Sequence, residues 1–493
     1  MEKTQKKCFD SEKYLILQEK DIREKLKNFD NKLYMEFGGK LLDDFHASRV
    51  LPGFESDIQM KMLDKFRDEC EIIMVVSASD IQGDKIRADY GITYAMEVKR
   101  LIKCFRDRGL IVSAVVITLF ENQPNAVTFK EKLEEDGEKV YTHYFTKGYP
   151  TDIDTIVSDE GYGKNEYIET SRPLVVITAP GPGSGKMATC LSQLYHEYKR
   201  GIKAGYAKFE KFPVYNLSIK HPVNVAYEAA TADLKDVNQI DSYYFDAYGK
   251  IAVSYNRDLQ AFPVLKNILY KIAGRDIYKS PTDMGINNIA NCIYDDDVAR
   301  DAAKQEIIRR YLKSKVDVKL GRANKEVPER IKLLMNELSL TIYDRKCVRP
   351  AEEKYIVSRK PSVAIELPDG KVVCGRQTEL LTACASSVLN ALKEMAGIED
   401  RFELLSTAIL GPIINLKKNI LSHESQLLSL RDVLLALSLC AKTLPIANAA
   451  LGRLLDLNGC NAHSTHILSD EETAVMKSLK INLTSYDMPL QEN

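Results

Sequence analysis

Short apolar runs alternate with amphipathic segments between residues 70 and 180, and this alternation constrains the fold more than any other feature of the chain. The runs occupy residues 72–76, 110–118 and 174–178, and a further strand is expected at 140–145. A strand that is buried on both faces gives such a run, and strands of that kind lie in parallel sheets covered by helices. Helical segments at 92–109 and 125–137 separate the runs. The pattern predicts an α/β fold with a mostly parallel sheet, Rossmann-like or P-loop-like, in the N-terminal region.

Changes in composition mark further boundaries along the chain. Residues 236–345 are mixed and largely helical, and residues 346–361 are charged with prolines on both sides, as expected for a linker. Beyond them, Pro368-Asp369-Gly370 separates two apolar runs, which predicts a hairpin. We therefore expect a P-loop-like α/β domain, a mixed middle domain, a linker and a smaller C-terminal α/β domain, at 1–235, 236–345, 346–361 and 362–493.

Composition excludes several classes of protein. The 493 residues carry 69 Lys and Arg against 70 Asp and Glu, so the chain lacks the positive charge of a dedicated nucleic-acid binder. No apolar run approaches the roughly 18 residues that span a bilayer. The opening stretch MEKTQKKCFDSEKY has no apolar segment of the kind found in secretory signals. We expect a cytoplasmic protein with neither a nucleic-acid nor a membrane partner.

The cysteines and histidines give no cofactor signature. The closest two of the ten cysteines, Cys374 and Cys384, stand ten positions apart, whereas zinc sites and redox motifs use closely spaced pairs. His463 and His466 lie in a stretch, HSTH, that favours a loop or strand. We expect isolated buried thiols, no metal site, and no zinc, haem or iron–sulfur cluster. A homo-oligomer is expected on general grounds, with twofold symmetry the commonest arrangement.

The most specific chemical signal is the segment RPLVVITAPGPGSGKMATCLSQLYHEYKRG, residues 172–201. An apolar strand runs into a glycine-rich turn, and a helix begins at its end. Glycines allow backbone N–H groups to converge on an anion, and the first helical turn adds unpaired N–H donors and partial positive charge. Lys186 can reach an anionic oxygen. The residues predicted to contact phosphate are Gly181, Gly183, Ser184, Gly185, Lys186 and Met187.

The match to the usual P-loop pattern, GxxxxGK[ST], is imperfect. Pro180 occupies the position of the first glycine, and Met187 occupies that of the Ser or Thr that holds Mg²⁺. Thr189 comes two residues later, on another side of the helix, and cannot simply replace it. Anion binding, ATP or GTP binding with Mg²⁺, and a turn needed only for strand–helix packing all remain open at this point.

Other polar residues are candidates for assisting roles. Asp283, in the loop SPTDMG, and Asp233, in TADL, could serve a metal or an acceptor, so with Lys186 they are the predicted catalytic residues; capping is the alternative for each aspartate. Asn256, Arg257 and Asp258 follow an apolar strand, where parallel sheets bind ligands, and are predicted to contact substrate. The lysines and arginine flanking the glycine turn are expected to be solvated surface charges: Lys164, Arg172, Lys208 and Lys211.

Several long motifs carry a resemblance to a known family. They are APGPGSGKMATC, FGGKLLDDFHASRVLPGF, IVSDEGYGKNEYIETSRPLVV, HPVNVAYEAATADL and KSPTDMGINNIANCI. Over nearly its whole length the chain resembles a bacterial protein family of unknown function. The resemblance implies a P-loop-like N-terminal region and a separate C-terminal domain, and it supplies no activity or catalytic residues.

Residues 362–396 are similar to the opening hairpin and first helix of cytidine deaminases. Those enzymes hold zinc with a His- or Cys-Ala-Glu at the helix start and a later Pro-Cys-x-x-Cys. Here the helix start reads Cys384-Ala385-Ser386, and no paired cysteines follow. The resemblance therefore implies the scaffold without its zinc chemistry, serving a structural, oligomeric or substrate-shaping role.

Two functions are consistent with the sequence. The first is an enzyme, an ATP- or GTP-dependent kinase or ligase acting on a small molecule, with Lys186 stabilising the charge that develops in transfer. The second is a scaffold or sensor that binds a phosphorylated metabolite or dinucleotide without hydrolysing it. In both cases the partner is a small phosphate-bearing ligand, and dependence on Mg²⁺ distinguishes them.

Overall fold

The chain forms two compact units. The computed structural model describes residues 6–39, 41–42, 44–87, 90–420 and 427–488. The N-terminal unit comprises residues 8–228 and 236–299, and the C-terminal unit comprises residues 300–488 with the short segments 6–7 and 229–235. The predicted middle domain, 236–345, is thus divided between the units. Its first part belongs to the N-terminal unit because it contributes a strand to that unit's sheet.

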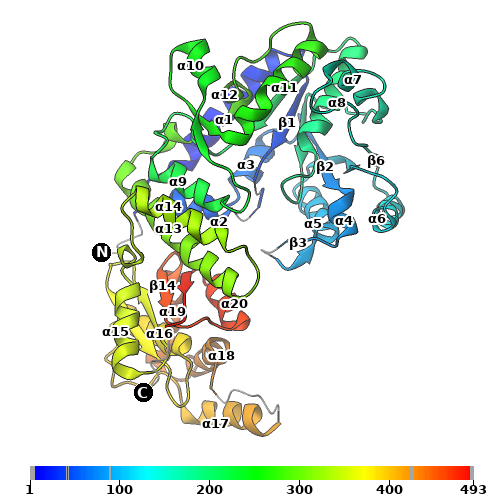
Figure 1. Ribbon diagram of the computed structural model, residues 1–493. Coiled ribbons are helices and arrows are strands. Elements are labelled where there is room, and N and C mark those ends of the chain that lie inside the picture. Colours follow the sequence, from blue (N-terminus) through cyan, green and yellow to red (C-terminus); the bar gives the residue numbers. More distant parts are fainter. Residues whose placement is uncertain (1–5, 40, 43, 88–89, 421–426, 489–493) are drawn as a thin grey trace. The chain divides into compact units, whose positions relative to one another are not determined.

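A seven-stranded sheet lies at the centre of the N-terminal unit (Figure 1). The strand order is β11–β8–β1–β7–β2–β5–β6, and every neighbouring pair is parallel. The strands are β1 (Leu33–Phe37), β2 (Cys70–Ser77), β5 (Ile111–Thr118), β6 (Val140–Thr142), β7 (Leu174–Thr178), β8 (Gly205–Phe209) and β11 (Gly285–Ile286). The predicted α/β fold with a parallel sheet is confirmed.

Helices pack on this sheet, and those on β1 and β8 frame the site described below. α8 packs on β1, β7 and β8, and α11 packs on α8, whereas α5 packs on β2 and β5. The helices are α1 (Ser11–Lys27), α2 (Phe45–Val50), α3 (Ile58–Lys65), α4 (Ala78–Gln82), α5 (Tyr94–Asp107), α6 (Pro124–Glu135), α7 (Ile153–Ile156), α8 (Lys186–Lys199), α9 (Pro222–Ala230), α10 (Ser242–Tyr248), α11 (Asn256–Ala273) and α12 (Pro281–Met284).

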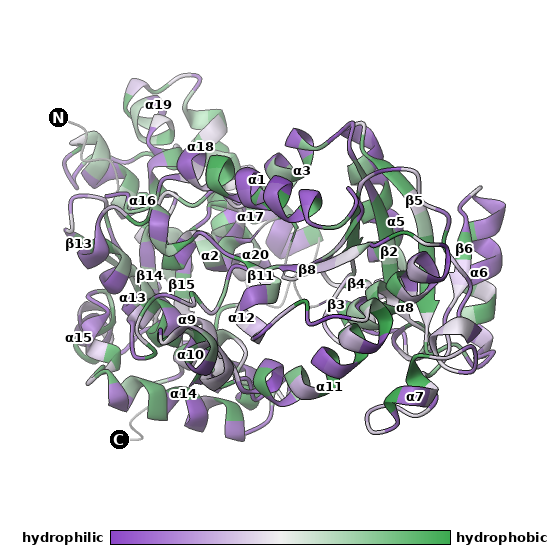
Figure 2. Ribbon diagram, turned by 90° about the horizontal axis from the view of Figure 1, so that it is seen from above, coloured by the Kyte–Doolittle hydropathy of each residue, from purple (hydrophilic) through white to green (hydrophobic). Residues whose placement is uncertain are grey.

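Hydrophobic burial explains why the apolar strands form the middle of the unit. β2 is buried at all eight positions, and β7 at all five. Figure 2 shows β2 and β5 as largely hydrophobic ribbons. Two small antiparallel pairs complete the strands of this unit: β3 (Ile86–Arg87) with β4 (Ile92–Thr93), and β9 (Asn238–Ile240) with β10 (Val253–Tyr255).

The C-terminal unit contains a four-stranded sheet in the order β13–β12–β14–β15. β12 is antiparallel to both of its neighbours, and β14 is parallel to β15. The strands are β12 (Ser362–Glu366), β13 (Val372–Arg376), β14 (Asn461–Ser464) and β15 (Asn482–Ser485). The hairpin predicted about Pro368-Asp369-Gly370 is therefore present.

The segment predicted as a linker, 346–361, is mostly helix in the structure. Val348, Ala351 and Tyr355 fall at helical spacing and are buried, and this helix, α15, packs on β12 and β13. The helices beyond α12 are α13 (Asp296–Lys319), α14 (Glu326–Glu337), α15 (Val348–Ser358), α16 (Ala383–Ala396), α17 (Thr407–Asn415), α18 (Leu430–Cys440), α19 (Pro445–Gly452) and α20 (Asp470–Ser478). Short 3₁₀ or π turns lie at Tyr162–Lys164, Ala290–Cys292, Ile342–Asp344, Leu416–Ile420 and Leu454–Leu457.

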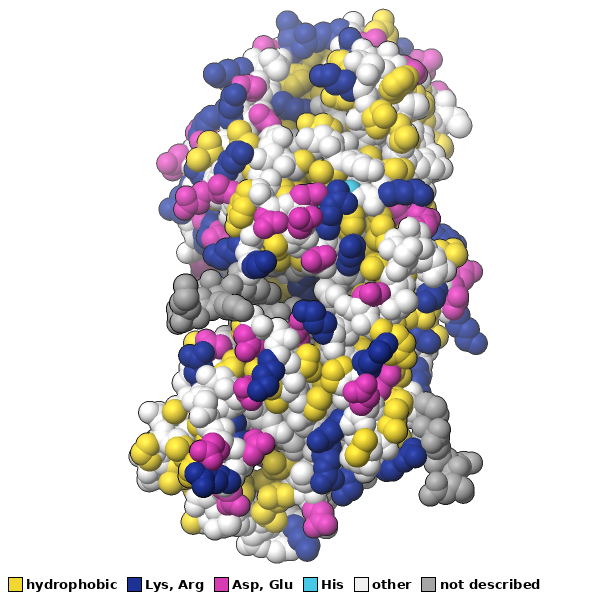
Figure 3. Space-filling view, turned by 90° about the vertical axis from the view of Figure 1, so that its left-hand side faces the viewer, with side chains coloured by type: hydrophobic (Ala, Val, Ile, Leu, Met, Phe, Trp, Pro, Cys, Tyr) yellow, Lys and Arg dark blue, Asp and Glu magenta, His cyan; other side chains and the backbone are white. Residues whose placement is uncertain are grey.

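The surface charges and the cysteines of the structure agree with what the composition predicts. Lys and Arg side chains are interspersed with Asp and Glu over the face shown in Figure 3. All ten cysteines are free, and eight of them are buried. None of the helices in the described residues combines the length and the apolar character needed to cross a bilayer.

Candidate functional site

The glycine-rich turn connects β7, the middle strand of the sheet, to α8. Gly183 and Gly185 have φ angles of +74° and +84°, in the left-handed region that glycine occupies without steric cost. Gly181 is required for a different reason, since a Cβ there would lie 2.2 Å from the Tyr94 hydroxyl oxygen. The turn therefore approaches its neighbours too closely, and bends too sharply, for larger residues.

Hydrogen bonds from side chains hold the turn in shape. Ser184 Oγ donates to the Gly181 carbonyl oxygen at 2.7 Å, and Thr118 Oγ1, at the end of β5, donates to the Ser184 carbonyl oxygen at 2.8 Å. Ser184 is fully buried. The Ser184 hydroxyl, predicted from the sequence to contact phosphate, is thus used inside the turn.

The N-terminus of α8 offers unpaired donors. The helix begins at Lys186, its N-cap Gly185 provides no side-chain hydrogen bond, and its first turn contains no acidic residue. The first N–H groups of any helix lack intrahelical acceptors and carry partial positive charge. Pro182 and Gly183 are exposed, so solvent and ligands can reach the turn.

The helix does not present a hydroxyl in place of the missing Mg²⁺ ligand. Thr189 is fully buried, and its Oγ1 donates to the Gly185 carbonyl oxygen at 3.1 Å. Met187 occupies the usual ligand position. The Thr189 hydroxyl is therefore engaged within α8.

Carboxylates and lysines form a row beside Lys186. The Lys186 Nζ lies 3.8 Å from Glu36 Oε1, and the two side chains are only 13% and 18% exposed. Glu36 stands on β1 directly beside Lys208 on β8, and Lys208 Nζ donates to Asp258 Oδ1 at 2.8 Å. Because neighbouring residues of parallel strands project from the same face, the sheet places Glu36 beside Lys208, and α8 and α11 add Lys186 and Asp258 to the row.

Glu210 extends the row. Its Oε1 lies 3.7 Å from Lys208 Nζ. Burial raises the pKa of Glu210 to about 7, helped by Asp258 and Glu36 and opposed by Lys208. Burial lowers the pKa of Lys208, but Asp258, Glu210 and Glu36 outweigh it, and the net pKa lies above the usual value. Glu210 is therefore suited to exchange a proton near neutral pH.

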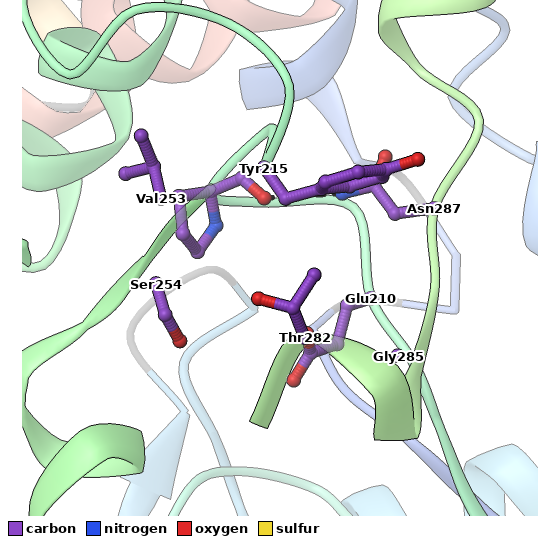
Figure 4. A pocket seen from close by; sticks show the side chains of 8 residues that line it. Glu210, Tyr215, Val253, Ser254, Thr282, Gly285 and Asn287 are labelled. Carbon is purple, nitrogen blue, oxygen red and sulfur yellow. Dashed lines mark hydrogen bonds between the residues drawn. The ribbon is translucent and has the colours of Figure 1, made fainter. Parts of the chain in front are cut away.

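A small polar cavity adjoins Glu210 (Figure 4). Its volume is about 20 Å³, enough for a single water molecule. Figure 4 shows the side chains of Glu210 and Thr282 next to each other, with Ser254 nearby and Tyr215 and Asn287 on the opposite side. These polar groups give a bound water several possible hydrogen-bond partners.

Of the predicted substrate residues, Asp258 alone joins the charged row. Asn256 begins α11 and accepts a hydrogen bond from the Val237 N–H at 2.9 Å. Arg257 is largely exposed and forms a 3.4 Å ion pair with Asp236. These two residues hold the start of α11 against the β9–β10 hairpin, which positions Asp258.

The two aspartates predicted to assist catalysis have other surroundings. Asp283 is part of a capping box with Ser280, and its Oδ2 also accepts a hydrogen bond from the Tyr248 hydroxyl at 3.0 Å. In the described residues no hydrogen bond or ion pair joins Asp283 to Lys186. Asp233 is exposed and belongs to the segment 229–235 of the C-terminal unit.

Sequence reasoning missed Glu36 and Glu210 and was wrong about two lysines. Lys208 and Lys211 were expected to be solvated, but their side chains are only 14% and 6% exposed; Lys211 forms an ion pair with the buried Asp44. Alternation of polar and apolar residues could have identified the two strands. YMEF and YAKFE both place polar residues at every second position, as in strands with one polar face.

In the C-terminal unit, Cys384 lies in the first turn of α16 and is fully buried. Burial raises the pKa of its thiol well above the usual value. The N-cap residue Thr382 donates to Glu472, on α20. Across the described residues no group of three or more metal-ligating side chains occurs.

Comparison with known proteins identifies the family. Residues 7–339 match the family described as "Domain of unknown function DUF1846, N-terminal", and residues 343–490 match its C-terminal counterpart. The chain belongs to this DUF1846 family. The family boundary falls at 339–343, close to the start of the predicted linker.

Relatives in the DUF1846 family align along almost the full chain. A UPF0371 protein of Clostridium botulinum (strain 657 / Type Ba4) is 55% identical over 486 residues, covering 97% of this chain and 96% of the relative. A UPF0371 protein of Clostridium tetani (strain Massachusetts / E88) is 54% identical over 485 residues with the same coverage. Neither description names an activity, so the function has to be argued from the site.

Proposed function

We propose that the turn at 179–185 and the first turn of α8 bind the phosphate groups of a nucleotide or a phosphorylated metabolite. One observation carries the proposal: an uncapped helix N-terminus follows a left-handed glycine turn at the carboxyl end of the middle strand of a parallel sheet. Ligands of such sheets bind at the carboxyl ends of the strands, and helix N-termini favour anions. Lys186 adds a formal positive charge beside the turn.

The arrangement supports a P-loop-like interpretation of the N-terminal unit. Strand, glycine turn, lysine and helix occur in the order that cradles phosphate in P-loop proteins. Glu36 lies near Lys186 Nζ, and a bound phosphate would compete for this ammonium group.

The reaction we propose is phosphoryl transfer, or ATP- or GTP-dependent activation of a small molecule. Lys186 and the backbone N–H groups would stabilise charge on the transferred group. If Mg²⁺ binds with the nucleotide, Glu36 and Asp258 would be the residues to supply carboxylate oxygens, which Mg²⁺ prefers as ligands. Glu210, with its raised pKa, would accept the proton of an acceptor hydroxyl. These residues replace Asp283 and Asp233 in the assisting roles, because Asp283 is engaged in a cap and Asp233 is exposed.

A non-hydrolytic binding protein is the second candidate. The specific observation in its favour is Met187 at the usual Mg²⁺-ligand position, together with the buried hydroxyl of Thr189. Phosphate binding by backbone N–H groups and a lysine needs no metal. The protein would then act as a sensor or scaffold for a phosphorylated metabolite or dinucleotide.

For the C-terminal unit we propose a cytidine-deaminase-like scaffold without zinc. The β12–β13 hairpin is followed by α16, which packs on both strands. Cys384 and Ser386 stand where such enzymes need a zinc ligand and a glutamate. A structural or oligomeric role fits a unit that keeps the scaffold and lacks those groups.

Calorimetric titration of the full-length protein tests the phosphate site. ATP, GTP, ADP and inorganic phosphate are each titrated with and without Mg²⁺ into wild type, Lys186→Ala and the control Lys199→Ala, at the exposed end of the same helix. We expect at least one ligand to bind wild type and the control, and to bind Lys186→Ala at least tenfold more weakly. Affinity unchanged in Lys186→Ala would refute the proposal.

Magnesium separates the two candidates. Binding of ATP or GTP that requires Mg²⁺, with slow release of phosphate or ADP, would support the transferase or ligase. Binding that ignores Mg²⁺, with the nucleotide recovered intact, would support the sensor or scaffold.

A further inference from the structure

A larger cavity lies elsewhere in the N-terminal unit, and the proposed phosphate site does not use it. Its volume is about 460 Å³, within the range of small-molecule sites. It is lined by the end of α1, the end of α10, the segment after α11, and α12, four elements that lie together in Figure 1. Thr282 lines the one-water cavity and Asp283 lines this one, so α12 contributes to both.

Lys25 presents an ammonium group to this cavity. Its Nζ donates to the Asp283 carbonyl oxygen at 2.6 Å and lies 5.0 Å from the ring centre of Tyr278. No carboxylate of the described residues lies within ion-pair distance of Lys25. Burial lowers the pKa of Lys25 to about 8, although Asp283, Glu210 and Asp21 act to raise it. A nearby anion would therefore stabilise the charged lysine.

Arg275 provides a second cation. It follows Gly274, whose left-handed conformation ends α11, and it is exposed. Within the described chain Arg275 forms no ion pair. The guanidinium is always charged and matches the geometry of phosphate and carboxylate groups.

The acidic residues in the lining are already engaged. Asp283 Oδ2 accepts hydrogen bonds from the N–H groups of Lys279 and Ser280 and from the Tyr248 hydroxyl. Asp276 lies 3.9 Å from Lys266. Neither Lys25 nor Arg275 forms an ion pair within the described residues, and Tyr248, whose ring has Lys279 Nζ 5.6 Å from its centre, also lines the cavity.

We propose that this cavity binds a small anionic metabolite carrying a phosphate or carboxylate group, with Lys25 and Arg275 as its cationic contacts. The inference goes beyond the phosphate site of the glycine turn and stands on separate residues. A protein with both sites would hold two ligands at once, as an enzyme with a donor and an acceptor does.

Equilibrium dialysis of the full-length protein tests the cavity. Radiolabelled inorganic phosphate is measured against wild type, Lys25→Met, Arg275→Ala and Lys186→Ala, and citrate is measured in a parallel series as the carboxylate source. We expect Lys25→Met and Arg275→Ala each to weaken the binding of phosphate or citrate at one site by at least tenfold. Lys186→Ala should leave the affinity of that site unchanged. Lys27→Met, an exposed change on the same helix as Lys25, is the control.

The outcomes separate this inference from the proposed function. If phosphate and citrate bind Lys25→Met and Arg275→Ala as tightly as they bind wild type, the cavity site is refuted. This holds whatever affinity is measured for Lys186→Ala. Binding lost in Arg275→Ala and untouched in Lys186→Ala would support the cavity and count against the glycine turn. Since Arg275 is exposed, its variant tests the site even if Lys25→Met is unstable.

Discussion

The two halves of the seven-stranded sheet are built on different principles. On β2 the run from Ile72 to Val76 is wholly apolar and fully buried. On β1 and β8 one face carries tyrosine, glutamate and lysine: the Tyr34 hydroxyl donates to Glu197 at 2.6 Å, and the Tyr206 hydroxyl donates to Glu36 at 3.0 Å. The apolar half supplies the hydrophobic core. The polar half buries charge at a cost in desolvation, and it carries the candidate site.

The difference leads to predictions about stability, because a buried charge is tolerated only where an oppositely charged or hydrogen-bonding group lies beside it. An unpaired ion inside a protein is far costlier than a missing methyl group. Stability should therefore respond to charge removal on β8 and to volume removal on β2, and phosphate binding should respond to changes in the glycine turn and on the β1–β8 side but not to volume removal on β2.

Lys208→Met is expected to have the largest effect. It leaves Asp258 and Glu210 without their cation, and breaking a buried pair costs about 3–5 kcal/mol. Guanidinium unfolding measures the loss. The control Lys130→Met removes an exposed pair with Glu134 on α6 and should change stability by less than about 0.5 kcal/mol. Similar small losses in both variants would contradict a charged row that is buried and tightly coupled.

Ile73→Ala tests the apolar half. Removing a fully buried isoleucine from β2 should cost about 2–5 kcal/mol, while the dissociation constant for phosphate, measured on the folded protein, stays at the wild-type value. Ile111→Ala, at the 41% exposed start of β5, should cost far less. A large change in phosphate affinity for Ile73→Ala would show that the two halves are not independent.

Gly181→Ala should act on stability and binding together. Its Cβ would meet the Tyr94 hydroxyl oxygen at 2.2 Å, and such overpacking costs about 1–3 kcal/mol. Displacement of the turn should also weaken phosphate binding at least tenfold in calorimetry. Gly452→Ala, at the exposed end of α19 with no atom within 4 Å of the new Cβ, should be neutral or slightly stabilising. Wild-type affinity in Gly181→Ala would argue against the turn as the binding element.

Glu210→Gln gives an effect that depends on pH. Because folding raises the pKa of Glu210 from 4.5 to about 7, its contribution to stability is full below pH 4.5 and is lost as pH rises toward 7 and above. The glutamine variant does not ionise. The stability difference, wild type minus Glu210→Gln, should therefore fall between pH 5 and pH 8 in urea unfolding. A constant difference would show that Glu210 titrates normally.

Most strands and helices of the apolar half of the sheet could be predicted from the sequence. The runs that became β2, β5 and β7 are continuous and apolar, and the helices between them follow clear amphipathic periods, so local pattern was enough. The strands of the polar half were missed because their five-residue patterns contain charged and aromatic residues, which resemble exposed segments. Lys208 looks solvated in sequence because nothing nearby reveals that Glu36 and Asp258 will surround it.

The candidate site divides in the same way. Gly181, Gly183, Gly185 and Lys186 lie within six consecutive residues, so the sequence alone identified the turn, the helix start and the lysine. Glu36, Lys208 and Asp258 lie 50 or more residues apart along the chain, and parallel strand pairing and the packing of α11 bring them together. The sequence determined the local elements because hydrophobic periodicity and glycine conformation are local properties. The tertiary structure alone decided which charges are buried together, because burial and Coulomb interactions depend on distances in space.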